Sequence, residues 1–188
     1  WTNRAFPGQA GIATDEHAEG WRAVADRVHE EGGTLFMQIM HGGRTSHPDL
    51  IDGANPEAPS AFDWGGTVRG FAGKKEELPH IVDEFRQGAR RAIDAGVDGV
   101  EIHGANGYLL HEFMAPSANK REDEFGGSPE NRWRLPEMVI RAVVEEIGAD
   151  RVGVRFSPAH NVQGVIEDDQ EDMLATYGGL LDALAPLN

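Results

Sequence analysis

The chain has 188 residues and no cysteine, with 17 lysine and arginine residues against 32 aspartate and glutamate residues, for a formal net charge of −15. This length suggests one domain or a piece of one. The lack of cysteine excludes disulfides, thiolate catalysis and Cys-ligated zinc or iron–sulfur clusters within the chain. The negative field disfavours nucleic acid and anionic membrane surfaces as partners. No apolar run approaches the roughly 20 residues that span a bilayer, so we expect a soluble, cytoplasmic protein.

The first predicted elements are a helix and a short strand. Residues 14–33, "TDEHAEGWRAVADRVHEEGG", carry apolar side chains at helical spacing, with Thr14 as N-cap. The run "TLFMQIM", residues 34–40, is almost wholly apolar and typical of a strand buried on both faces of a parallel sheet. Gln38 is its exception. A buried amide costs roughly 1–3 kcal/mol unless it is hydrogen-bonded, so we expect a partner for Gln38, either backbone or a ligand with amide-like edges.

A long loop rich in Gly, Pro, Ser and Asp follows, from about residue 41 to 75, and loops of this length are usually functional or mobile. The alternation then continues, with helices beginning near residues 78, 128 and 169 and strands over 97–102 and 151–156. The third of the four helices starts at a Ser-Pro pair, with serine as N-cap and proline in the first turn. Pro136 lies inside it and predicts a kink or a break.

Strands that alternate with crossover helices imply a parallel sheet, either doubly wound or closed into a (β/α)8 barrel. Neither a Gly-x-Gly-x-x-Gly nor a P-loop pattern follows any strand, which counts against a nucleotide-binding open sheet. Polar side chains follow each strand instead, and barrel enzymes place their chemistry at the carboxyl ends of strands; these side chains are Gln38, His41, His103, Arg155 and Ser157. We therefore predict an α/β fold of the (β/α)8 barrel type. Residues 1–188 would be the central segment of one domain, with about three strands, their helices and no internal boundary.

Three hydrogen-bonding side chains, His103, Asn106 and Tyr108, lie within six positions at the end of the second strand. Neutral histidine and asparagine each have an N–H group that donates, and both could stabilise negative charge on one carbonyl or nitro oxygen. A tyrosine, with an ordinary pKa near 10, can supply a proton to a carbanion-like centre. These parts suit hydride addition to an electron-poor alkene followed by protonation. The alternative is a well-capped loop in which Tyr108 only packs.

Arg155 would be a buried cation that needs an anion or an electron-rich ring, unless a surface salt bridge satisfies it. A flavin would satisfy two residues at once, offering its pyrimidine edge to Gln38 and its N1–C2=O region to Arg155. We expect no metal site, because neither His-x-His nor His-Glu-x-x-His occurs. The charged stretch "SANKREDEFGGSPENRWR", residues 117–134, is expected to be a rigid strut rather than a catalytic segment.

Three stretches resemble consecutive blocks of the old yellow enzyme family, the FMN-dependent ene-reductases of the N-ethylmaleimide reductase and pentaerythritol tetranitrate reductase type. They are "QIMHGGRTSHP", "GVDGVEIHGANGYLLHEFMAPSANKREDEFGGSPENRWR" and "GADRVGVRFSP". The resemblance implies a (β/α)8 barrel with FMN at its carboxyl-terminal face. It implies that Gln38 and Arg155 contact the flavin, that His103 and Asn106 hold the substrate oxygen, and that Tyr108 donates the proton.

The resemblance also implies that NAD(P)H reduces the FMN and that the substrate is a small α,β-unsaturated carbonyl or nitro compound. Many members have tryptophan where this chain has Met40, a difference that bears on substrate shape. On the family pattern the segment runs from the helix after strand two to the helix after strand five. Acting alone, it is expected to bind FMN weakly or not at all and to associate through uncovered barrel edges. Two alternatives remain, a catalytically inactive partial barrel that joins a complementary chain and a segment of a dienoyl-CoA reductase-like flavoprotein.

Overall fold

The computed structural model describes residues 3–64, 67–72 and 75–187, and a parallel sheet of three strands organises them. The strand order is β1–β6–β7, with β1 at Phe36–Ile39, β6 at Gly99–Gly104 and β7 at Val152–Phe156. All three predicted strands are present, each shorter or slightly shifted. The parallel register places Gln38 beside Glu101 and His103 beside Arg155.

The helices follow the predicted alternation, with one addition. They are α1 (Asp15–Glu30), α2 (Pro79–Asp94), α3 (Leu109–Met114), α4 (Pro129–Arg132), α5 (Arg134–Ile147) and α6 (Gln170–Leu184). Thr14 caps α1 as predicted, accepting a hydrogen bond from the backbone N–H of His17. The predicted break near Pro136 is confirmed, because α4 ends at Arg132 and α5 restarts at Arg134, so the proline lies in a first turn where its missing N–H costs nothing. No helix of the described residues is long and apolar enough to cross a membrane.

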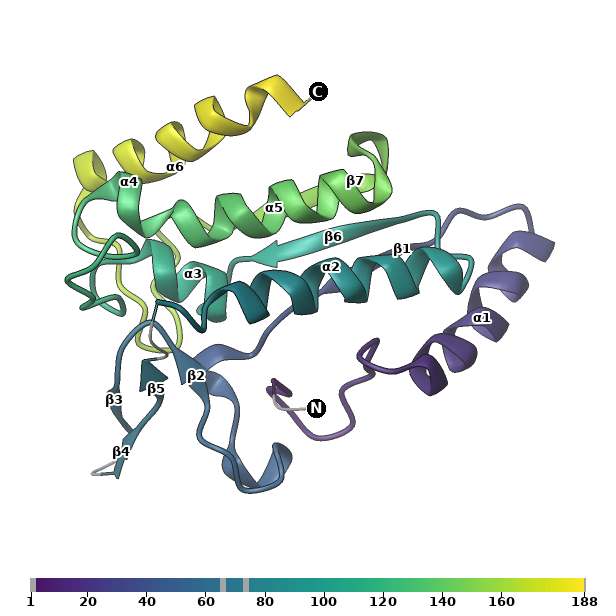
Figure 1. Cartoon of the computed structure of the whole chain (residues 1–188), viewed down its shortest axis with the longest axis horizontal. Helices are drawn as coiled ribbons and strands as arrows, with labels where there is room; N and C mark the ends of the chain where they lie inside the picture. Colours follow the sequence, from purple (N-terminus) through teal and green to yellow (C-terminus); the bar gives the residue numbers. More distant parts are fainter. Residues whose placement is uncertain (1–2, 65–66, 73–74, 188) are drawn as a thin grey trace.

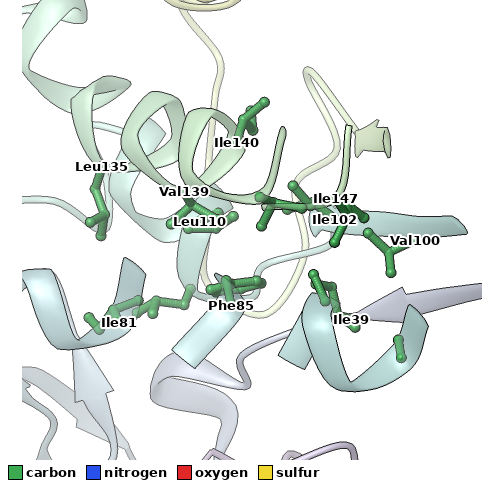
Figure 2. Close-up of a cluster of buried hydrophobic side chains, with 14 of the residues drawn as sticks. Ile39, Ile81, Phe85, Val100, Ile102, Leu110, Leu135, Val139, Ile140 and Ile147 are labelled. Carbon is green, nitrogen blue, oxygen red and sulfur yellow. The ribbon is translucent and has the colours of Figure 1, made fainter. Parts of the chain in front are cut away.

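Helices α2 and α5 pack side by side over one face of the sheet (Figure 1). Alternate strand residues point into this layer, where they form the main core with apolar side chains of the two helices (Figure 2); those labelled in the figure are Ile39, Ile81, Phe85, Val100, Ile102, Leu110, Leu135, Val139, Ile140 and Ile147. Burial of each large apolar side chain contributes about 1.5–3 kcal/mol. This core fixes the strand register and therefore the positions of the residues at the strand ends.

The other face of the sheet is open. Phe36 is 52% exposed, and Gln38 and Arg155 are also exposed. The predictions that residues 34–40 are buried on both faces and that Arg155 is a buried cation are therefore wrong for this chain. Side chains alternate along a strand, and the described residues cover the face that carries the odd-numbered residues of β1 but leave the other face exposed at β1 and at Arg155.

The segment between β1 and α2 carries structure of its own rather than forming one open loop. It holds the one-turn 3-10 helices η1 (Gly43–Thr45) and η2 (Pro48–Leu50) and four short strands; these strands are β2 (Glu57–Ala58), β3 (Phe62–Trp64), β4 (Thr67–Arg69) and β5 (Phe71–Ala72). β2 pairs with β5 in parallel, and β3 pairs with β4 as a hairpin. This excursion and α3 gather near the carboxyl end of β6 (Figure 1). Two more 3-10 helices, η3 (Ala149–Arg151) and η4 (Ala185–Leu187), follow α5 and α6.

Candidate active site

Four polar side chains line the open face of the sheet: Gln38, Glu101, His103 and Arg155. The register pairs them two by two, and the alternation of side chains along β6 places Glu101 and His103 on the same face. Nε2 of Gln38 donates a hydrogen bond to Oε1 of Glu101. Within the chain, the partner of Gln38 is thus a carboxylate of the neighbouring strand rather than the backbone. Among the described residues, no hydrogen bond or ion pair engages the Arg155 guanidinium.

His103 is buried, with 4% of its surface exposed, and its Nδ1 has no hydrogen-bond partner among the described residues. Burial lowers the pKa of His103, and the positive charge of Arg155 lowers it further. The ring is therefore neutral at physiological pH, with one donor nitrogen and one acceptor nitrogen. Its centroid lies 5.2 Å from that of Tyr108, with the rings tilted by 50°. The structure thus brings two of the three predicted catalytic side chains together beside an unsatisfied polar atom.

Asn106 is held by the loop that follows β7 rather than by the other predicted site residues. Its backbone N–H donates to Oγ of Ser157 at 2.8 Å, and its backbone carbonyl accepts from Nε2 of Gln163 at 3.0 Å. Its side-chain Oδ1 lies 3.2 Å from Nδ1 of His160. Asn106 has a φ of 57° and Gly107 one of 80°, the left-handed region that asparagine tolerates and glycine favours.

A buried network under this turn holds Gly107, and the sequence did not reveal it. The Gly107 N–H donates to Nδ1 of His111 at 2.9 Å, and Nε2 of His111 lies 3.2 Å from Oε2 of Glu167 without forming a hydrogen bond to a described residue. Glu167 accepts from the Ala159 N–H at 3.1 Å and from the Tyr177 hydroxyl at 3.1 Å. Burial, and then the charge of Glu167, raise the pKa of Tyr177, which keeps its proton for this bond. The network joins α3, α6 and the loop after β7 beneath the predicted catalytic turn.

A second cluster fastens the excursion to the sheet. His41 is 2% exposed, and its Nε2 lies 2.9 Å from Glu57 and 4.0 Å from Glu84, the one group of side chains among the described residues that could converge on a metal ion. Nδ1 of His41 accepts from the Gly43 N–H at 3.1 Å, so Nε2 carries the hydrogen and donates it to Glu57. A metal ligand needs a free lone pair on that nitrogen, so this tautomer suits a structural hydrogen bond.

His80 completes the same cluster, with its Nε2 2.6 Å from Oε1 of Glu57. Burial alone would raise the pKa of Glu57, but the hydrogen bonds from His41 and His80 and the charge of His80 bring it below its ordinary value. Partial burial opposes protonation of His80, yet the Glu77 carbonyl and the carboxylates of Glu57 and Glu84 raise its pKa. The cluster therefore links β2 to α2 through charged hydrogen bonds between Glu57 and His80.

A cavity of about 490 Å³ lies along β1, between the segment before α1 and helix α2. Its lining includes Gln38 and Met40 but none of His103, Asn106, Tyr108 or Arg155. Since β1 pairs only with β6 among the described strands, the cavity follows the edge where a further strand would hydrogen-bond. We therefore place the candidate site at the carboxyl ends of β6 and β7 rather than in this cavity.

Residues 2–177 match the NADH:flavin oxidoreductase / NADH oxidase family, and the chain belongs to this family. It is 45% identical over 177 residues to putative 12-oxophytodienoate reductase 5 of Oryza sativa subsp. japonica, covering 90% of this chain and 47% of the relative. It is 41% identical over 182 residues to a probable flavin mononucleotide-dependent alkene reductase of Leishmania infantum, covering 88% and 50%.

The solved structure of an old yellow enzyme homologue from Zymomonas mobilis is similar to this chain, with a TM-score of 0.86 and 36% identity, covering 94% of this chain and 52% of that one. The predicted resemblance and fold class are confirmed: the three parallel strands and their helices are part of a (β/α)8 barrel of the old yellow enzyme type. The chain spans about half the length of the relatives that it matches.

Proposed function

We propose that the protein carrying this chain binds FMN and uses NAD(P)H to reduce the activated C=C bond of small α,β-unsaturated carbonyl or nitro compounds. The observation that carries the proposal is His103, a neutral, buried ring with an unsatisfied Nδ1 beside Tyr108 at the carboxyl end of β6. Membership of the flavin oxidoreductase family and similarity to a probable alkene reductase support it. In this proposal residues 1–188 are the central segment of a single FMN-binding domain.

Gln38 and Arg155 would hold the flavin. Both are exposed on the open face of the sheet. The Arg155 guanidinium has no hydrogen-bond or ion-pair partner among the described residues, so it is available to bind an anionic group. The amide of Gln38 matches the donors and acceptors of a pyrimidine edge, and the guanidinium suits the N1–C2=O region, where negative charge gathers on reduction. Held by these residues, FMN would supply the hydride chemistry of the reaction, with the nicotinamide as the source of the electrons.

The protein's own side chains would handle the charge and the proton. His103 and Asn106 would donate N–H groups to the carbonyl or nitro oxygen, where negative charge develops as the hydride reaches the β-carbon. Tyr108 would give its hydroxyl proton to the α-carbon, which completes the saturated product. Each donor of this kind typically contributes a factor of about 100 to 1000 to the rate.

Replacement of Tyr108 by Phe tests the proton transfer. We expect the variant to reduce alkenes at least about 100-fold more slowly, because a positioned general acid contributes on the order of 10² to 10⁴. Flavin reduction by NAD(P)H should be unchanged, since it needs no proton from this hydroxyl. Stopped-flow absorbance of the flavin measures the two half-reactions separately.

The chain offers a matched control, because it has only two tyrosines. Tyr177 is buried in α6 and bonds to Glu167, so Tyr177→Phe should lower stability without changing the ratio of the two half-reaction rates. Equal losses in both half-reactions for Tyr108→Phe would contradict a proton-donor role. A protein that binds no flavin at all would overturn the proposed function itself.

A further inference from the structure

Three side chains of the loop after β7 take up almost every polar atom of Asn106. Ser157 binds its backbone N–H, Gln163 binds its backbone carbonyl, and His160 faces its side-chain oxygen. Among the described residues, none accepts a hydrogen bond from the side-chain NH2 group of Asn106. The turn thus presents one unengaged donor, and this donor is the group that the proposed function needs.

The contact with His160 bears on which end of the amide is free. Oδ1 of Asn106 faces Nδ1 of His160 at 3.2 Å, and because an amide oxygen only accepts, this arrangement requires the tautomer of His160 that carries its hydrogen on Nδ1. With the amide turned end for end, the NH2 group would face His160 and the oxygen would face the substrate. An oxygen there would repel a carbonyl or nitro oxygen instead of binding it.

The contacts of Asn106 with Ser157 and Gln163 do not select an orientation of its side-chain amide. Ser157 and Gln163 bind only the backbone of Asn106, and the backbone groups are the same for both orientations of the amide. Asn106 also keeps its φ of 57° in both. His160, with its hydrogen on Nδ1, is the described side chain whose contact favours one end of the amide over the other.

The loop holds His160 in place. The His160 N–H donates to the Ser157 carbonyl at 3.2 Å, and the next residue, Asn161, binds the Glu167 N–H at 2.9 Å and the Asp168 carboxylate at 2.6 Å. The His160 side chain itself is exposed, so its replacement leaves the packed core intact. The contact to Asn106 can therefore be removed without disturbing the fold.

We propose that His160 carries its hydrogen on Nδ1 and acts as a positioning residue that turns the Asn106 NH2 group toward the substrate oxygen. The proposal rests on the proposed function in one respect, the role of Asn106 as a donor to the substrate oxygen. It adds the reason why that residue donates rather than accepts.

A double-mutant cycle tests the proposal in the FMN-loaded protein. His160→Phe keeps a ring without a donor, whereas His160→Gln keeps a donor on a flexible side chain. Each is combined with Asn106→Ala, and kcat/KM is measured for cyclohex-2-enone with excess nicotinamide. We expect His160→Phe to lower kcat/KM by roughly three- to tenfold, the value of one hydrogen bond, and His160→Gln to recover most of it. In the Asn106→Ala background the effect of His160→Phe should vanish.

The rate of flavin reduction by the nicotinamide is the internal control and should not change. An unchanged kcat/KM in His160→Phe would overturn the proposal. So would the same fractional loss with and without Asn106, because His160 would then act by another route.

A second measurement separates this proposal from the proposed function. The side-chain NH2 signals of Asn106 in the ¹H–¹⁵N NMR spectrum are identified by their loss in Asn106→Ala and can be followed without turnover. His160→Phe should shift them, and His160→Gln should largely restore them. If the protein reduces no enone, the proposed function fails while these signals still decide the role of His160. If the Asn106 NH2 signals are unchanged in His160→Phe, the positioning role of His160 is overturned.

Discussion

Glu112 is fully buried within α3, one turn after Tyr108. Its Oε1 accepts the Arg44 N–H at 2.9 Å, and its Oε2 has no hydrogen-bond partner among the described residues. Burial raises the pKa of Glu112 well above the ordinary 4.5, and the charge of Arg44 offsets only part of the effect. A Cβ at Gly43 would lie 2.4 Å from the Glu112 carboxylate, so this close approach requires glycine. The carboxyl group is therefore a buried packing group that caps η1, and its burial favours the protonated form.

Glu112→Gln should change the pH dependence of stability. A carboxyl group whose pKa is raised in the folded state stabilises fully below its unfolded pKa, and this contribution is lost as pH rises through the folded pKa. The free energies of unfolding of the native chain and the variant should thus be similar near pH 4.5, and the variant should gain relative to the native chain at higher pH. Urea unfolding at several pH values measures this difference. A difference that does not vary with pH would mean that Glu112 is ionised in the fold.

Arg132 shows how the charged stretch 117–134 acts at the level of elements. Its guanidinium is 3% exposed, donates to the Met114 carbonyl at 2.8 Å and forms a two-pronged pair with Asp172 at 2.6 and 2.7 Å. It also donates to the Thr176 hydroxyl at 2.9 Å. These bonds tie the end of α3 and the helix α4 to α6, in agreement with the predicted strut.

Arg132→Lys should destabilise the fold by about 1–3 kcal/mol, because an ammonium lacks the planar fork whose three nitrogens reach the Met114 carbonyl, the Gly127 carbonyl and Asp172 separately, and so leaves buried acceptors unsatisfied. Arg90→Lys is the matched control. Its pair with Asp94 is exposed, with side chains 40% and 60% accessible, so that change should cost no more than about 0.5 kcal/mol. Chemical denaturation of both variants gives the comparison. Similar small losses at the two positions would show that Arg132 is not a strut.

Among the helices and strands, the local sequence pattern predicts the long helices but not the short elements. The long helices have one apolar stripe each, and this spacing predicts α1, α2, α5 and α6 closely. Helix α3 was missed because it is only six residues long and its polar residues, His111 and Glu112, are buried with the apolar ones, so no amphipathic period marks it. Strands β2 to β5 are two or three residues long, too short to show a periodic pattern, and β2 exists only through its pairing with β5.

At the scale of the molecule, the position of the candidate site was predictable and its contacts were not. Parallel strands end at one edge, so polar residues at three strand ends predict a shared site. The burial of Gln38 and Arg155 was misjudged because it depends on what covers the second face of the sheet. The pairs His160–Asn106 and His111–Glu167 join segments more than 50 residues apart, and nothing in their local sequence marks them.

The unpaired strand edges and the exposed leucines of α6 favour association between copies of this chain. Strands β1 and β7 each pair only with β6 among the described strands, which leaves backbone N–H and carbonyl groups free on both outer edges. Helix α6 exposes Leu174 and Leu181, at 60% and 55%. Exposed apolar side chains near an unpaired strand edge favour association of chains.

We therefore expect residues 1–188 alone to self-associate at about 10–100 μM, in the range where uncovered apolar surface drives association. Sedimentation velocity should show species heavier than the 20.5 kDa monomer, growing with concentration. Leu174→Glu with Leu181→Glu should shift the distribution toward the monomer by placing charge on that face. Val68→Glu, at a residue 74% exposed on the β3–β4 hairpin, is the control and should leave it unchanged. A monomer at every concentration would show that the open face and edges do not drive assembly.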